Sequence, residues 1–171
     1  MPDYTLIIGN KNYSSWSLRP WLWMKHVGLD FTEKRIALFE ENTDELLSPY
    51  FSDYKVPILL DGELTVWDSL AILEYLAEKH PDKHGWPEDE RARAVARSVS
   101  AEMHSGFARL RAALPMNCRR RFDDFPVSYD VLKEIQRVQA IWAYCRKKFG
   151  ENGPWLFGDF SIADAMYAPV A

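Results

Sequence analysis

The first 80 residues combine short apolar runs with stretches of helical period. An apolar run at 4–9 is stopped by Gly9 and Asn10, as is typical of a buried strand, and residues 31–37 are predicted to form a second strand. Residues 16–27 and 40–47 have the pattern of helices. Two further runs flank Asp61-Gly62, a pair typical of the tight turn in a β-hairpin. With a final helix over 68–79, the predicted order is β-α-β-α-β-β-α.

Beyond residue 80 the apolar residues follow helical periods alone. Residues 81–87 contain two prolines and a glycine, which predicts a linker. We therefore expect an α/β domain over 1–80 and an all-α helical bundle over 88–171. The helical pattern continues to the last residue, and we expect the second domain to be truncated at its C-terminus.

Three helices are predicted in the second half. A single long helix is expected over 88–114, because its apolar residues recur at spacings of three and four. Residues 129–149 form another helix of the same kind. Ser161 and Asp164 have the spacing of a capping box, with Asp in place of the usual Glu. They predict the start of a third helix.

Two short motifs in the first half suggest a binding site. Lys55-Val56-Pro57 places a proline directly before a strand, where it removes one backbone donor. An edge strand would explain it, but the turn could also open the peptide groups of Val56 to an extended ligand. Asp68 and Ser69 begin a helix. Both are favoured caps, and the same helix end could bind a carboxylate.

The composition limits the functional classes. A net charge of -4 over 171 residues argues against nucleic acid as a partner. Residues 1–4 lack a signal-peptide pattern and no apolar run is long enough to cross a membrane, so we expect a cytoplasmic protein. Cys118 and Cys145 lack CxxC spacing and are expected to be free thiols packed between helices. The four histidines are dispersed, so no metal is expected.

Together these features resemble the glutathione S-transferase family. The element order of the first half is that of a thioredoxin-like domain, and a helical half follows after a short linker. The markers are the Val56-Pro57 step, the Asp68-Ser69 pair and the capping box over 161–164. Each marker is weak alone, but their order and spacing along the whole chain carry the resemblance.

The loop over residues 13–19, Tyr-Ser-Ser-Trp-Ser-Leu-Arg, is similar to the serine-bearing loop of the zeta class, which includes the maleylacetoacetate isomerases. That class has Ser-Ser-Cys, whereas Trp16 stands at the cysteine position in this chain. The difference argues against isomerase chemistry. The absence of cysteine from this helix start also argues against thioredoxin, glutaredoxin and omega-type reactions.

The resemblance implies a glutathione site. It implies that the Val56-Pro57 peptide is cis and that Val56 pairs with the cysteinyl unit of glutathione. It further implies that Ser69 binds the γ-glutamyl carboxylate and that Asp68 faces the ammonium group. Most relatives carry Glu or Gln where this chain has Asp68. Glutathione is then a co-substrate.

Catalysis in this family lowers the pKa of the bound glutathione thiol, because the thiolate is the nucleophile. A hydroxyl that donates to sulfur beside a helix N-terminus favours the thiolate. Ser14 matches the catalytic serine of the zeta-type loop and is our predicted donor, with Ser15 and Tyr13 as alternatives. The serines could instead cap the first helix.

The favoured function is a glutathione S-transferase that attacks a small apolar electrophile and serves detoxification. The resemblance also implies a homodimer. We expect the second substrate between the two halves, near Met103, His104, Phe107 and Arg111, although the apolar stripe would also suit a helical core. The alternatives are a non-catalytic glutathione-binding or assembly module and a glutathione-dependent cis-trans isomerase.

Overall fold

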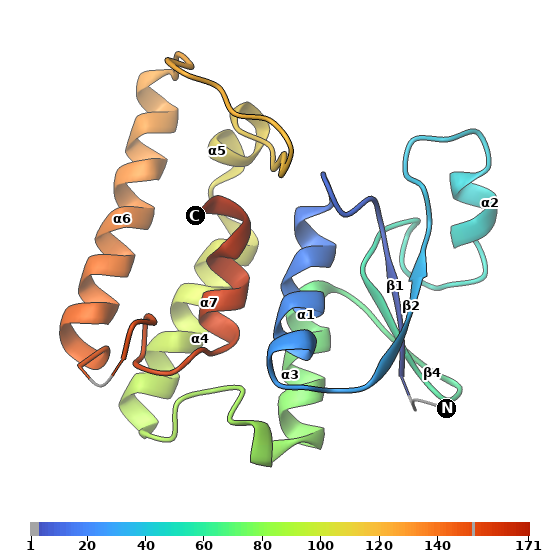
Figure 1. The fold of residues 1–171 in the computed structure, drawn as a ribbon, viewed down its shortest axis with the longest axis horizontal. Coiled ribbons are helices and arrows are strands. Elements are labelled where there is room, and N and C mark those ends of the chain that lie inside the picture. The colour runs from blue at the N-terminus through green and yellow to red at the C-terminus, as the bar shows by residue number, and fades with distance from the viewer. Residues whose placement is uncertain (1–3, 152) are drawn as a thin grey trace. The chain divides into compact units, whose positions relative to one another are not determined.

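The structure is a computed structural model that describes residues 4–151 and 153–171 (Figure 1). Its contacts divide the chain into two compact units, Met1–Lys83 and His84–Ala171. The first three residues, which belong to the stretch without a signal-peptide pattern, lie outside the described part. Within the described residues, no helix has both the length and the hydropathy that crossing a membrane requires.

The first unit is built on a four-stranded sheet in the order β2-β1-β3-β4. Strand β1 (Tyr4–Ile8) is parallel to β2 (Phe31–Arg35) and antiparallel to β3 (Ile58–Asp61). Strand β3 pairs in turn with β4 (Leu64–Val66), also antiparallel. The mixed sheet therefore has β2 and β4 at its edges, and β3 is an interior strand.

Helices cover both faces of this sheet. Helices α1 (Ser15–His26) and α3 (Ser69–Lys79) lie side by side on one face, and the short α2 (Thr43–Leu47) lies on the other (Figure 1). Leu6 and Ile7 point to opposite faces of β1, and both are fully buried. The observed element order is the predicted one, so the thioredoxin-like fold class is confirmed.

The strand register brings three separate segments together at one end of the strands. Ile7, near the end of β1, pairs with Ile58 at the start of β3. Leu59 pairs with Val66 at the end of β4. Because these pairs are antiparallel, three segments lie at the same end of the strands: the loop after β1, the loop that enters β3 and the loop that leaves β4.

The hairpin turns one residue later than predicted. Asp61 pairs with Leu64, so the two turn residues are Gly62 and Glu63. Gly62 has a φ of 58°. Only glycine adopts this left-handed conformation without steric cost, so the position of Gly62 sets the turn.

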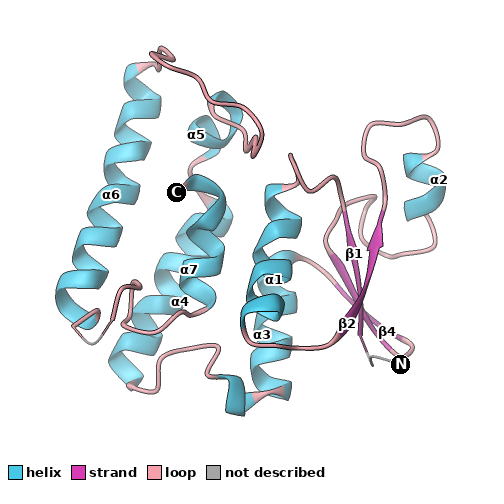
Figure 2. Ribbon diagram, in the orientation of Figure 1, coloured by secondary structure: helices cyan, strands magenta, loops and turns pink. Residues whose placement is uncertain are grey.

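The second unit consists of helices joined by loops (Figure 2). They are α4 (Glu90–Ser105), α5 (Ala108–Ala113), α6 (Tyr129–Phe149) and α7 (Ile162–Tyr167), followed by a 3-10 turn at Ala168–Val170. The prediction for residues 129–149 is confirmed. The described part of the unit thus has the expected helical character.

The single helix predicted over 88–114 is wrong. Helix α4 ends at Ser105 and α5 begins at Ala108, because Gly106 is extended and Phe107 is left-handed with a φ of 56°. Glycine is a poor helix former, so Gly106 is a natural place for the chain to leave the helix. The apolar spacing continues through the break and conceals it.

Helix α7 begins at the predicted capping box. The Asp164 carboxylate accepts hydrogen bonds from the Ser161 backbone N–H at 2.9 Å, the Ser161 hydroxyl at 3.0 Å and the Leu156 backbone N–H at 2.9 Å. The Tyr167 hydroxyl at the other end donates to the Val99 carbonyl at 2.9 Å. These bonds join α7 to the preceding loop and to α4.

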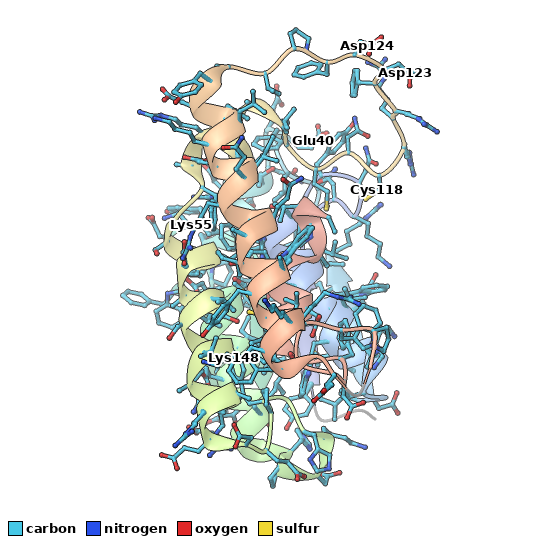
Figure 3. The ribbon with its side chains drawn as sticks, turned by 90° about the vertical axis from the view of Figure 1, so that its left-hand side faces the viewer. Glu40, Lys55, Cys118, Asp123, Asp124 and Lys148 are labelled. Carbon is cyan, nitrogen blue, oxygen red and sulfur yellow. The ribbon has the colours of Figure 1, made fainter. Side chains whose placement is uncertain are left out.

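The two cysteines are free thiols, as predicted, but only one of them is packed. Cys145 is fully buried in α6. Cys118 is exposed on the loop between α5 and α6, which also carries Asp123 and Asp124 (Figure 3). The expected packing of Cys118 is therefore wrong. Burial, with a smaller contribution from the charge of Asp164, raises the pKa of Cys145 to about 11.

Candidate functional site

A cavity of about 430 Å³ lies in the first unit, where the loops after β1 and β2 meet the loop before β3. Its lining consists of residues 13–16, 38–41, 43, 44 and 54–56. Tyr13, Ser14, Ser15 and Val56, which come from two of the sequence motifs, thus line one cavity. The shared end of the strands explains why segments so far apart in sequence meet here.

Ser14 immediately precedes α1, but its side chain makes no capping hydrogen bond. Its hydroxyl lies 2.8 Å from the Ser17 hydroxyl, which also accepts from the Gly9 N–H at 3.1 Å. Ser17 is only 3% exposed. Since either hydroxyl of the pair can donate, Ser17 can direct its proton to Ser14. The Ser14 hydroxyl can then donate to a ligand in the cavity.

Arg19 fixes the first turn of α1 from inside the protein. It is fully buried, its Nη1 donates to the Ser15 carbonyl at 2.8 Å, and its guanidinium carbon lies 3.9 Å from the centroid of the Trp16 ring. This positive charge adds to the positive end of the helix dipole. No role for Arg19 was predicted from the sequence, although its four-residue spacing from Ser15 indicated that the two could meet on one helix face.

The backbone of Val56 is open on the side of the cavity. The Val56-Pro57 peptide is cis, as the family resemblance implied. Among the described residues, the Val56 peptide groups have no hydrogen-bond partner. Because β3 is an interior strand, the edge-strand explanation for Pro57 does not apply. An extended ligand could pair with Val56 as an added strand does.

Asp68 and Ser69 follow β4 at the same end of the strands, but they are not among the residues that line the cavity. Asp68 caps α3, and its carboxylate accepts from the Leu70 N–H at 3.2 Å. The Ser69 side chain is 1% exposed, and its hydroxyl has no hydrogen-bond partner within the described chain. A buried hydroxyl without a partner is costly. A ligand carboxylate at this helix end would fit it.

Charged side chains of both signs surround the cavity. The exposed carboxylates of Glu40, Glu41 and Asp44 lie along its lining, as does Lys55 (Figure 3 labels Glu40 and Lys55). Lys55 is 2.6 Å from Asp53, and the hydrogen bond from its ammonium group lowers the pKa of Asp53. The lining therefore has charges that can bind a ligand with both an ammonium group and carboxylates.

The residues predicted to contact a second substrate lie in the helical unit. Met103 and Phe107 are buried, while His104 and Arg111 are partly exposed. The Arg111 Nε donates to the Gly106 carbonyl at 3.1 Å. None of these four residues lines the cavity at α1, and their contact with a second substrate stays a prediction. In the described residues, no three His, Cys, Asp or Glu side chains gather as metal ligands.

Comparison with known proteins agrees with this geometry. Residues 13–79 match the glutathione S-transferase N-terminal domain. A probable maleylacetoacetate isomerase from Caenorhabditis elegans is 39% identical over 93 residues, which are 54% of this chain and 42% of that protein. The maleylacetoacetate isomerase of Rattus norvegicus is 29% identical over 170 residues, covering 91% and 70% of the two chains. The chain thus spans under half the length of the first of these relatives.

A crystal structure of a glutathione transferase homolog from Burkholderia, with bound glutathione, has the same fold. It superposes with a TM-score of 0.66 at 25% sequence identity, over 96% of this chain and 77% of that one. The similarity therefore extends through both halves of the chain.

Proposed function

Because the chain belongs to the glutathione S-transferase family, we propose that it binds glutathione in the cavity at α1 and stabilises its thiolate for attack on an apolar electrophile. The observation that carries this proposal is that Ser14 and the open backbone of Val56 line the same cavity. One supplies a hydroxyl donor for sulfur, and the other supplies a place for an extended peptide.

In this proposal glutathione lies at this end of the strands. Its cysteinyl unit pairs with Val56, and its γ-glutamyl carboxylate gives the buried Ser69 hydroxyl a partner. Asp68 at the same helix start attracts the ammonium group. The sulfur then lies toward Ser14 at the N-terminus of α1, with Ser15 and Tyr13 in the same lining as the alternative donors.

Three features of the chain favour the thiolate at that position. The Ser14 hydroxyl, which donates to Ser17 in the structure, can turn to donate to sulfur while the Ser17 hydroxyl, held by the Gly9 N–H, donates to Ser14 in its place. The N-terminus of α1 and the buried charge of Arg19 add positive potential. The thiol proton leaves to water. A fall of two units from a free thiol pKa of about 8.5 corresponds to about 2.7 kcal/mol.

Isomerisation is a second candidate, because two relatives bear the name maleylacetoacetate isomerase. The position at which the zeta class has cysteine is filled here by Trp16, whose ring lies under the Arg19 guanidinium. An isomerase on this chain would have to act through the glutathione thiolate alone. Transfer to an electrophile needs no residue beyond those of the cavity.

We further propose a cytoplasmic homodimer with a role in detoxification. Support for association comes from Phe51, which is 83% exposed and packs edge-on against the exposed Trp67 ring at a centroid distance of 5.4 Å. Neighbouring aromatic side chains in contact with water are typical of a surface that binds another protein.

Calorimetry can test the glutathione proposal without any electrophile. Titrations with glutathione in two buffers of different ionisation enthalpy count the protons released on binding. We expect release of about 0.7 proton near pH 7, because a thiol whose pKa falls by two units from about 8.5 becomes about three-quarters ionised on binding. We expect none with S-methylglutathione, whose sulfur has no proton. Ser14→Ala should bind glutathione with less proton release, whereas Ser48→Ala, an exposed serine on another loop, should match the wild type.

Failure of glutathione to bind would contradict the proposal altogether. Binding without proton release would instead favour the non-catalytic binding module.

A further inference from the structure

The second unit has a cavity of about 470 Å³, which shares no lining residue with the cavity at α1. Its walls come from three segments: residues 84 and 86–89 with Ala92 at the start of α4, Phe149 at the end of α6, and residues 157 and 159–161 before α7. Cavities of this volume are typical of small-molecule sites. We call it the aromatic cavity, because its lining includes the rings of Trp86, Phe149, Phe157 and Phe160.

Hydrogen bonds hold the three segments of the aromatic cavity together. The Ile162 N–H at the start of α7 donates to the Gly85 carbonyl at 2.9 Å. Arg146 on α6 donates to the Pro154 carbonyl, and two antiparallel bridges fold the chain tightly over residues 155–159. The walls are therefore in place before a ligand binds, which lowers the entropic cost of binding.

Two rings of the aromatic cavity already lie beside cations of the protein. The Arg97 guanidinium carbon is 5.4 Å from the centroid of the Trp86 ring, and the Lys148 Nζ is 5.4 Å from that of Phe149 (Figure 3 labels Lys148). The Phe149 and Phe157 rings stack at a centroid distance of 5.6 Å. The face of an aromatic ring carries negative charge and attracts a cation. Neither Arg97 nor Lys148 lines the cavity, so the space inside is left to a ligand.

Three exposed carboxylates line the same cavity, and no lysine or arginine is among its described lining residues. Glu88 lies 3.1 Å from the His84 Nδ1, and Asp89 accepts from the Ala92 N–H at 2.8 Å. The Asp159 carboxylate has neither a hydrogen bond nor an ion pair within residues 4–151 and 153–171. Asp159 is therefore the carboxylate that can turn to a ligand without breaking a bond within the described chain.

Two helix N-termini beside the cavity favour anions, but their effect is weaker. Each N-terminus carries about half a positive charge. The first N–H groups of α4 are capped by Asp89, and those of α7 by the capping box over 161–164. Arg93 donates to the Pro87 and Glu88 carbonyls and does not line the cavity. The three whole charges of the carboxylates therefore decide the sign, and the cavity favours a cation.

The walls also limit the kind of cation. Hard metal ions need a set of oxygen ligands, and the described part of the chain brings no three His, Cys, Asp or Glu side chains together for a metal. Aromatic rings cannot replace the water around a small, strongly hydrated ion. An ammonium group covered by alkyl groups has apolar contacts to offer and is still attracted by the ring faces, which is how aromatic cages recognise quaternary ammonium ligands.

We propose that the aromatic cavity binds an organic cation, with an alkylated ammonium group against the rings and the Asp159 carboxylate as its counter-charge. The apolar part of the ligand fills the rest of the volume. The proposal does not depend on glutathione binding, because none of these residues lines the cavity at α1.

The charge of the ligand is tested first, on the full chain and without glutathione. Benzyltrimethylammonium is titrated and followed by proton NMR. We expect saturable binding and an upfield shift of the N-methyl signal, because ring faces shield protons that lie above them. Choline and 3,3-dimethylbutan-1-ol have the same shape and differ in a charged nitrogen or a neutral carbon. We expect choline to bind at least about tenfold more tightly than the alcohol.

The place of binding is tested with two variants and their matched controls. Asp159→Asn should bind benzyltrimethylammonium about threefold more weakly, because it removes one nearby charge. Phe157→Leu keeps an apolar side chain but removes a ring, and we expect a similar loss. Asp30→Asn makes the same change in net charge in the first unit, and Phe125→Leu removes a ring that is 50% exposed. Both controls should bind as the wild type does.

No saturable binding of benzyltrimethylammonium, or equal affinities for choline and the alcohol, would overturn the proposal. Equal affinities of Asp159→Asn and Asp30→Asn would overturn it too, since the cation would then respond to net charge alone. Asp159 is exposed, so this comparison decides the matter even if Phe157→Leu does not fold.

Discussion

At the scale of single residues, the Ser14–Ser17 pair is central to the proposed chemistry. Ser17 is buried and does not line the cavity at α1, so we expect it to act by orienting Ser14. In Ser17→Ala the Gly9 N–H loses its acceptor and the Ser14 hydroxyl loses its hydrogen-bond partner. We expect the pKa of the bound glutathione thiol to rise by about one unit.

Two measurements distinguish the positioning role of Ser17 from a purely structural one. If Ser17 positions Ser14, the affinity of Ser17→Ala for S-methylglutathione should stay close to that of the wild type. Ser17→Thr, which keeps the hydroxyl, should restore part of the thiol pKa shift. An unchanged thiol pKa in Ser17→Ala would refute the positioning role.

Asp164 is the residue on which the start of α7 depends. Burial raises the pKa of Asp164, and hydrogen bonds from the Leu156 and Ser161 backbones work against that rise. Asn offers one acceptor oxygen where the carboxylate offers two. We expect Asp164→Asn to lower the free energy of unfolding in urea by about 2–3 kcal/mol. The exposed Asp159→Asn is the control, and an equal loss in both would contradict this account.

The residue scale also shows where sequence reasoning ends. The motifs predicted that Ser14 and Val56 belong to one site, and the cavity contains both. The partner of Ser14 was not predictable, because four hydroxyls in one loop are equally polar and only burial distinguishes Ser17. The Glu33 contacts to Lys11 and Trp21 depend on how β2 and α1 lie together, and local spacing does not encode that.

At the scale of elements, an ion pair links α4 to α6. Arg137 on α6 donates to both carboxylate oxygens of Glu102 on α4, at 2.7 and 2.8 Å. These hydrogen bonds lower the pKa of Glu102 below its ordinary value of 4.5. The pair therefore stabilises the fold above that pH, and its contribution is lost as the pH falls through the lowered value.

The substitution Glu102→Gln should measure how much the Glu102–Arg137 pair contributes to the free energy of unfolding. At neutral pH we expect a loss of up to about 1 kcal/mol in the free energy of unfolding, since the pair is partly exposed. The difference from the wild type should shrink as the pH falls below 4.5. Urea titrations at a series of pH values measure it, with Glu63→Gln in the hairpin turn as control. A difference that is constant with pH would contradict the linkage.

At this scale, an element was predicted correctly where its local sequence signals were strong. Helix α6 occupies the predicted residues because a cap at Ser128 and a long apolar period agree. The α4–α5 break at Gly106 was missed because Met103, Phe107 and Leu110 keep a helical spacing across it. All three are buried, so packing in the helical unit preserves the pattern even where the backbone leaves the helix.

At the scale of the whole molecule, the proposed homodimer makes a clear prediction. Phe51→Ser removes the most exposed ring of the Phe51–Trp67 pair, and we expect sedimentation velocity to show a shift from dimer toward monomer. Leu132→Ser, an exposed apolar side chain on α6, is the control and should stay dimeric. A monomeric wild type, or a variant that associates as before, would contradict the role of Phe51.

The central claim is that the chain holds glutathione as a thiolate through Ser14. The most direct test is an ultraviolet difference titration of glutathione bound to the full-length protein, which follows thiolate absorbance against pH. We predict ionisation well below the free thiol value of about 8.5, and a return toward that value in Ser14→Ala. A depression that survives in Ser14→Ala would move the role to Ser15 or Tyr13, and an unshifted thiol in the wild type would contradict the claim.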